Sequence, residues 1–147
     1  MHIVILQFIA VLSAALFAGA ALYINVAEHP ARMSLETRIA AAQWAPSYKR
    51  ATWLQAPFAL VSLLSGVGVW LLGGNVAWLA AALLVGAVVP VTFGIIMPTN
   101  HKLLTPGRDL SSVETRELLA HWGRLHAVRT LLSLIGTVIY IWLLLDA

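Results

Sequence analysis

The sequence predicts an all-α integral membrane protein, a bundle of four transmembrane helices that run up and down. Of the 147 residues, 61% are hydrophobic and only 10% are charged, and the mean hydropathy is +0.88. Soluble domains carry about 25% charged residues, so this composition indicates a surface that faces lipid. Four apolar segments of about 20 residues or more are each long enough to cross about 30 Å of hydrocarbon as a helix.

The predicted spans form a single domain and cover approximately residues 3–26, 51–72, 76–97 and 118–145. The second and third are joined by Gly73-Gly74-Asn75, a turn so short that the two helices must be antiparallel neighbours. Residues 34–45 predict a short cytoplasmic helix at the membrane interface, which Pro46 should end. Ser111 and Glu114 predict a capping box at the start of the last helix.

The charges give the predicted orientation. All nine lysines and arginines lie between Arg32 and Arg129, in or next to the loops at 27–50 and 98–117. The positive-inside rule places these loops in the cytoplasm and both termini outside, as expected in the inner (plasma) membrane of a bacterium. The net charge of +3 does not indicate nucleic-acid binding, because no basic stripe with interleaved aromatic residues is present. The absence of cysteine excludes disulfides, thiolate metal sites and cysteine nucleophiles.

Polar side chains from three separate segments reach the inner membrane boundary at one depth. At about 20 residues per crossing, the first span reaches this boundary near Tyr23 and the last span, counted back from Leu145, near His126. The residues at this level are Asn25, Glu28, His29, Arg32, Asn100, His101, Trp122, His126 and Arg129.

Helical spacing gathers these residues into stripes. On the first and last helices the polar positions recur at steps of three and four, so each set lies on one face. A charge that faces lipid costs up to about 2.5–3.5 kcal/mol, so the two stripes should face each other inside the bundle. Pro30 and Pro98 should end or kink their helices there and free backbone carbonyls. Other basic residues, Lys49, Arg50, Lys102 and Arg124, are expected to extend towards lipid phosphates.

Three segments carry these polar residues within apolar sequence: FAGAALYINVAEHPARM at 17–33, IIMPTNHKL at 95–103 and HWGRLHAVRT at 121–130. In this order on four spans they resemble the anthrone oxygenase family of small membrane proteins, and the resemblance covers nearly the whole chain. It implies a four-helix membrane protein, with some members oxidising polyketide anthrones to anthraquinones with dioxygen. The family's recurring polar positions correspond to Glu28-His29-Pro30 with Arg32, to Asn100, and to Trp122, His126 and Arg129.

The favoured hypothesis is a membrane oxidoreductase that acts with dioxygen on a phenolic, anthrone-like or quinol-like apolar substrate at the cytoplasmic end of the bundle. A carboxylate or imidazole would serve as general base, guanidinium and amide groups would stabilise the oxyanion, and the indole would stack on the ring. The expected catalytic residues are Glu28, His126, Arg129, Arg32 and Asn100, and the expected substrate-binding residues are Trp122 and Asn25.

Three alternatives remain open from the sequence. A non-haem metal (iron, copper or zinc) could be bound by His29, His101, His126 and Glu28, or no cofactor is needed. A haem-bearing electron carrier would use His29 and His126 as axial ligands. A non-enzymatic lipid-binding or small-ligand-binding protein would hold an anionic head group with Arg32 and Arg129. The expected partners are the bilayer and an apolar aromatic molecule or lipid, and a homo-oligomer is left open.

Overall fold

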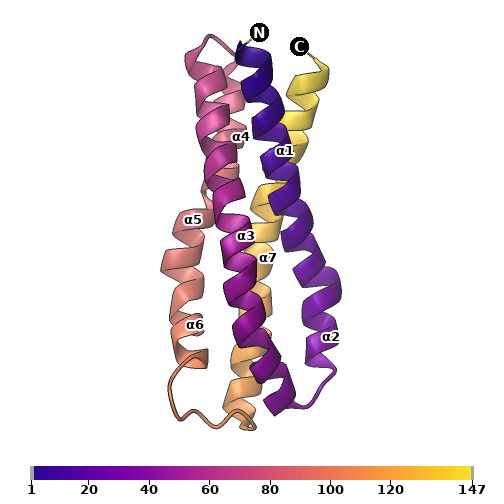
Figure 1. Ribbon diagram of the computed structural model, residues 1–147, viewed down its shortest axis with the longest axis vertical. Coiled ribbons are helices and arrows are strands. Elements are labelled where there is room, and N and C mark those ends of the chain that lie inside the picture. The colour runs from indigo at the N-terminus through magenta and orange to yellow at the C-terminus, as the bar shows by residue number, and fades with distance from the viewer. Residues whose placement is uncertain (1, 147) are drawn as a thin grey trace.

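The structure is a computed structural model that describes residues 2–146. Within them the regular structure is helical, and four rods run alternately up and down with both chain ends at one end of the bundle (Figure 1). Each rod is long and apolar enough to cross a membrane, which confirms the predicted four-helix membrane bundle. In chain order the rods are α1 (His2–Tyr23) with η1 (Ile24–Glu28) and α2 (His29–Met33); α3 (Thr37–Leu71); α4 (Val76–Gly86) with α5 (Val88–Val91), η2 (Thr92–Ile96) and α6 (Met97–Leu103); and α7 (Val113–Leu145).

The first and third rods are longer than predicted and continue to Met33 and Leu103. The proline-containing turns do not end them, because a π-helical turn, η1 or η2, precedes each proline. In η1 the His29 N–H bonds the Ile24 carbonyl, five residues earlier, and Pro30 then lies in the first turn of α2. The same arrangement precedes Pro98. The two wide turns lie at the polar level of the bundle, and π-helical turns of this kind are frequent at functional sites.

The predicted interfacial helix at 34–45 does not exist as a separate element, and the expectation that Pro46 ends it was wrong. α3 runs without interruption from Thr37 through Pro46 to Leu71. A proline inside a helix costs about 3 kcal/mol. Burial of a large side chain repays a comparable amount, about 1.5–3 kcal/mol. Trp44, which is 1% exposed, packs with Leu119 of α7 and holds this part of α3 in line.

The ends of the charged loops are fixed by hydrogen bonds. Ser112 is the N-cap of α7, because its Oγ accepts the Thr115 N–H at 3.1 Å, so the predicted capping box at Ser111 was wrong by one residue. Arg116 of α7 donates to the Met33 carbonyl at the end of α2. This contact satisfies a terminal carbonyl and attaches the first rod to the last.

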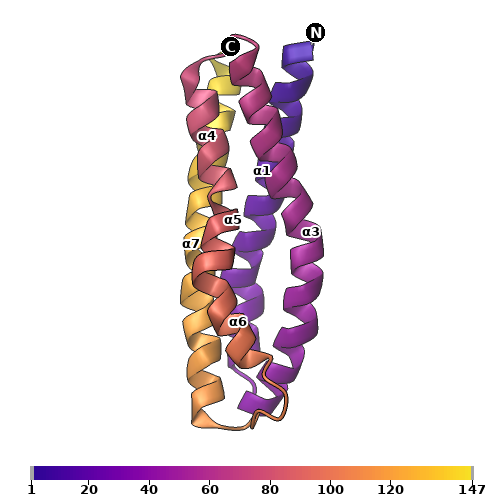
Figure 2. The same cartoon turned by 90° about the vertical axis from the view of Figure 1, so that its left-hand side faces the viewer.

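The two halves of the bundle pack differently. In the half that contains the chain ends, α4 packs along α3 around small residues such as Ala10, Ala14 and Ala82, which allow the backbones to approach closely. In the other half, α5, η2 and α6 pack chiefly against α7 (Figure 2). The third rod is therefore less closely packed against α3 at the polar end of the bundle.

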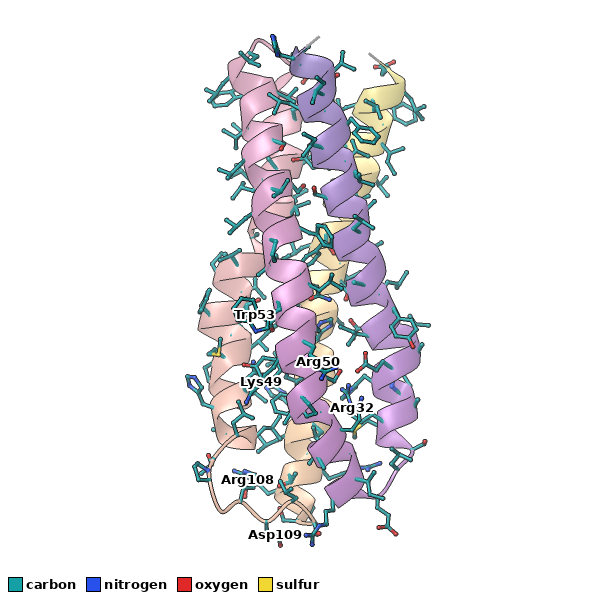
Figure 3. The ribbon with its side chains drawn as sticks, viewed as in Figure 1. Arg32, Lys49, Arg50, Trp53, Arg108 and Asp109 are labelled. Carbon is teal, nitrogen blue, oxygen red and sulfur yellow. The ribbon has the colours of Figure 1, made fainter. Side chains whose placement is uncertain are left out.

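The membrane boundary is marked on α3 by Trp53 and Arg50, both on the exposed surface (Figure 3). Trp53 is 83% exposed, and indoles prefer the membrane interface. It lies about 27 Å along the helix from Leu71 at 1.5 Å per residue, close to the hydrocarbon thickness. The polar residues described below lie near this level of the bundle.

Candidate functional site

Arg32 is the centre of a buried network at the membrane boundary. It is 3% exposed and lies between α2 and α3 (Figure 3). Its guanidinium donates to Glu28 Oε1 at 2.5 Å, to Ser47 Oγ at 3.3 Å and to the Gln43 side-chain carbonyl. Ser47 also donates to the Glu28 carboxylate. Because the Glu28 carboxylate is already bonded to a guanidinium and a hydroxyl, it is a poorer candidate for a general base than a free imidazole.

His29 is a positioned neutral imidazole. Its Nδ1 lies 3.1 Å from Arg32 Nη1. A guanidinium can only donate, so this Nδ1 accepts and the ring carries its proton on Nε2. The Nε2 faces α7 at Gly123, where an added Cβ would lie 2.5 Å away. The close approach of α2 to α7 therefore requires a glycine at this position.

His126 has the opposite tautomer, which Asn25 determines. The Asn25 amide donates from Nδ2 to the Gly123 carbonyl at 3.1 Å, so its Oδ1 must be the acceptor for its other contacts. That Oδ1 lies 2.9 Å from His126 Nδ1 and accepts the Thr130 hydroxyl at 2.5 Å. The proton of the neutral His126 ring is therefore on Nδ1, and Nε2 has a free lone pair. His126 is only 1% exposed, and an unprotonated ring nitrogen is what a general base requires.

The Trp122 indole packs against both histidine rings. Its ring centroid is 5.2 Å from that of His29 and 5.0 Å from that of His126. Trp44 packs edge-on against it at 5.9 Å and 82°. The indole, rather than a porphyrin-sized cavity, lies beside both imidazoles, so His29 and His126 do not fit the axial positions of a haem. The predicted haem-carrier alternative is not supported by this geometry.

Arg129 is paired with a residue that the sequence analysis did not identify. Its Nη2 donates to Gln55 Oε1 at 2.9 Å, and its guanidinium lies 5.4 Å from the Phe17 ring centroid. Gln55 is 1% exposed in the middle of α3. The available signal was a single amide within an apolar span, since polar residues at membrane depth are often functional.

An apolar cavity of about 280 Å³ lies between α3 and the third rod. Its lining is mostly aliphatic and aromatic, with Asn100, Trp122 and Arg129 at the inner wall. Leu60 of α3 and Phe93 of η2 line it as well and are 50% and 67% exposed, so the cavity opens sideways towards lipid. An apolar molecule could therefore enter from the hydrocarbon without crossing the aqueous boundary.

A second, smaller hollow of about 10 Å³ adjoins this cavity and shares Tyr48, Thr52, Trp122 and Arg129 with it. Its other polar lining consists of Glu28, Arg32, Ser47, Gln55 and His126. The volume is about that of one water-sized sphere. The inner wall of the apolar cavity thus leads into a polar pocket that contains a base and a guanidinium.

Comparison with known proteins gives the family. The protein-family model described as Anthrone oxygenase matches residues 44–139. The chain belongs to the anthrone oxygenase family. It is similar to anthrone oxygenase ptaC of Pestalotiopsis fici, 30% identical over 115 residues that cover 67% of this chain and 80% of that protein. It is also similar to anthrone oxygenase tpcL of Aspergillus fumigatus, 34% identical over 70 residues that cover 46% of this chain and 44% of that protein. No solved structure matches.

The part of the chain matched to the anthrone oxygenases contains most of the cavity. It begins at Trp44 and includes the polar residues Gln55, Asn100, Trp122, His126 and Arg129. Of the network around Arg32, Glu28, Arg32 and Gln43 precede it, whereas Ser47 lies within it. The surroundings of the apolar cavity are therefore the part of the candidate site that the family match covers.

The four residues expected to bind a metal do not come together in the structure. Within residues 2–146, no group of three or more His, Cys, Asp and Glu side chains is arranged to hold a metal ion. His101 is exposed. The Glu28 carboxylate is bonded to Arg32, and His29 Nδ1 accepts from the same guanidinium. These residues do not fit an iron, copper or zinc site, and we assign no step to a metal.

The remaining predicted residues are placed as follows. Asn100 is 1% exposed, and it lines the apolar cavity. Lys49, Arg50, Lys102 and Arg124 are exposed, consistent with contacts to head groups. Figure 3 labels the first two on α3. His121 is also exposed and lies away from the polar pocket.

Proposed function

We propose that this protein is a membrane oxidoreductase that oxidises an apolar phenolic compound, an anthrone or a related ring system, with dioxygen. The observation that carries the proposal is the junction of a lipid-facing apolar cavity with a polar pocket that contains His126 and Arg129. Two similar fungal proteins bear the name anthrone oxygenase, which supports the same substrate class.

The apolar cavity suits a compact, planar ligand. Its volume of about 280 Å³ is just below the range of about 300–1,000 Å³ for small-molecule sites. The ring system would enter between Leu60 and Phe93 and contact Trp122 at the inner wall. Asn100 Oδ1 has no partner within residues 2–146 and would accept a hydroxyl of the ligand.

The chemistry begins with proton transfer. His126 Nε2 would take a proton from the ligand, and the Arg129 guanidinium would stabilise the oxyanion that results. The electron-rich anion then reacts with dioxygen. In the overall reaction a ring CH₂ group loses both C–H bonds and becomes C=O. One oxygen atom of dioxygen enters the product and the other leaves as water, so atoms and electrons balance.

The experiment compares two histidine variants of the full chain in lipid nanodiscs. His126→Ala should lower anthrone turnover by about 10²–10⁴-fold, because general-base catalysis contributes this much. His121→Ala removes an exposed histidine from the same helix and should leave turnover unchanged. Formation of anthraquinone and consumption of dioxygen would be measured together, with empty nanodiscs giving the rate of spontaneous oxidation. Turnover no faster than in empty nanodiscs, or equal loss in both variants, would overturn the proposal.

The polar end of the bundle is proposed to face the cytoplasm, and the bacterial inner membrane is the proposed location, although the similar proteins are fungal. The support is the basic character of the loops at that end. Because the chain has no cysteine, a single Cys introduced at Asn75 or at Thr105 can be labelled selectively in intact cells. An impermeant maleimide should label the Asn75→Cys protein only, and the reverse pattern would reject this orientation.

A further inference from the structure

Three buried N–H groups around the small hollow have no acceptor within residues 2–146. They are Gln55 Nε2, Trp122 Nε1 and Arg129 Nε, and all three residues line the hollow. Indole and guanidinium nitrogens are donors only. The orientation of the Gln55 amide is fixed, because its Oε1 must accept from Arg129 Nη2, which leaves Nε2 as the free end. A buried donor without a partner is unfavourable and rare in folded proteins, so three such donors on residues that line one hollow require an explanation.

One ordered water does not satisfy this set. A water molecule has two lone pairs and therefore accepts at most two hydrogen bonds, whereas three residues that each carry an unpartnered donor line a hollow with room for about one water-sized sphere. The lining holds two guanidiniums, Arg32 and Arg129, and one carboxylate, Glu28, which is bonded to Arg32, so its net charge is positive and is carried by Arg129. The occupant that matches the donors, the charge and the size is an oxygen atom that only accepts hydrogen bonds and carries negative charge.

We propose that the hollow is an oxyanion site and that Gln55 is one of its binding residues. Gln55 donates from Nε2 to the bound oxygen and, through Oε1, holds Arg129 in position. This inference rests on the proposed oxidation of an anthrone-like substrate. The oxygen has two chemical sources: the oxyanion of the ring, which reaches the hollow from the apolar cavity, and the superoxide or peroxide that forms when dioxygen accepts electrons from the ring anion.

Two variants separate a binding role of Gln55 from a structural one. Gln55→Leu removes both the donor and the acceptor for Arg129. Gln55→Glu has nearly the same shape and keeps the acceptor, but it replaces the Nε2 donor by a carboxylate oxygen. If Gln55 only orients Arg129, the glutamate variant should behave like the wild type. If the hollow binds an oxyanion, it should be at least as impaired as the leucine variant, because the carboxylate repels that oxygen and neutralises the guanidinium.

Steady-state rates in nanodiscs, with anthrone and dioxygen varied separately, are the first measurement. Loss of one oxyanion-hole donor lowers rates by about 10²–10³-fold, and we expect both variants to fall by this much. Gln7→Leu, a matched change in α1 outside the cavities described above, should have no effect. The thermal unfolding temperature is recorded for every variant, and if Gln55→Leu does not fold, the shape-conserving Gln55→Glu decides the result.

Ligand binding distinguishes the two sources of the oxygen. Quenching of tryptophan fluorescence would report the affinity for anthraquinone, which carries ring oxygens, and for anthracene, which does not. Weaker anthraquinone binding with unchanged anthracene binding, together with a lower kcat/KM for anthrone, assigns the hollow to the ring oxygen. Unchanged binding of both compounds with a lower kcat/KM for dioxygen assigns it to reduced dioxygen.

The inference is overturned if Gln55→Glu turns over like the wild type, or if neither variant changes any of these quantities. If the wild type shows no turnover above empty nanodiscs, the proposed oxidation fails, and the binding measurements still test the hollow. In that case weaker anthraquinone binding by Gln55→Glu supports the oxyanion site, and unchanged binding rejects it.

Discussion

A methyl group added at Gly123 should leave the protein less stable than the same methyl group added at Gly19. In Gly123→Ala the new Cβ would lie 2.5 Å from His29 Nε2 and 2.6 Å from its Cδ2. His29 cannot move freely, because it is 8% exposed, packs against Trp122 and is bonded to Arg32. At Gly19 an added Cβ meets no other atom within 4 Å among the described residues.

The magnitude follows from two terms. Replacement of glycine by alanine inside a helix stabilises by about 1 kcal/mol, and this term applies to both variants. Overpacking of a filled site costs about 1–3 kcal/mol, and this term applies to Gly123 alone. We therefore expect Gly19→Ala to be more stable than the wild type, and Gly123→Ala to be less stable than Gly19→Ala by about 1–3 kcal/mol.

Unfolding in mixed micelles with increasing dodecyl sulfate, followed by circular dichroism, measures this difference. Adding His29→Ala to the Gly123→Ala chain should recover most of the loss, because it removes the side chain that the methyl group meets. Equal stabilities of the two alanine variants within about 0.5 kcal/mol would refute the close packing of α2 against α7. The absence of recovery in the double variant would show that another contact is responsible.

The other predictions concern the site itself. Asn25→Leu should destabilise by about 1–3 kcal/mol and lower turnover, since His126 Nδ1 loses its acceptor, and unchanged values of both would contradict the assigned tautomer. Asn100→Leu should weaken binding of a hydroxylated anthraquinone but not of anthracene in fluorescence titrations, and equal weakening would indicate loss of cavity shape. Treatment with EDTA should leave anthrone turnover unchanged, and recovery of lost turnover by added iron, copper or zinc would disprove our exclusion of the metal site.

The sequence by itself determined the membrane fold and which polar residues share one level of the bundle. Both depend only on lengths measured along the helix axis: the thickness of the hydrocarbon and the constant rise of a helix per residue. Counting residues therefore placed Asn25 and His126 at one level, where the structure joins them by a hydrogen bond. The composition fixed the lipid-facing surface for the same reason, since few charges are available to face water.

Only the tertiary structure decided which polar groups pair. Helical spacing gives the face of a residue relative to its own helix, but two π-helical turns shift that face, and interhelical packing selects the partner. Arg32 therefore bonds to α3, His101 is exposed, and Gln55, a single amide in an apolar span, becomes the partner of Arg129. The continuity of α3 through Pro46 was decided in the same way. The sequence shows only the proline, which weakens a helix locally, whereas packing against other helices stabilises it by more than the proline costs.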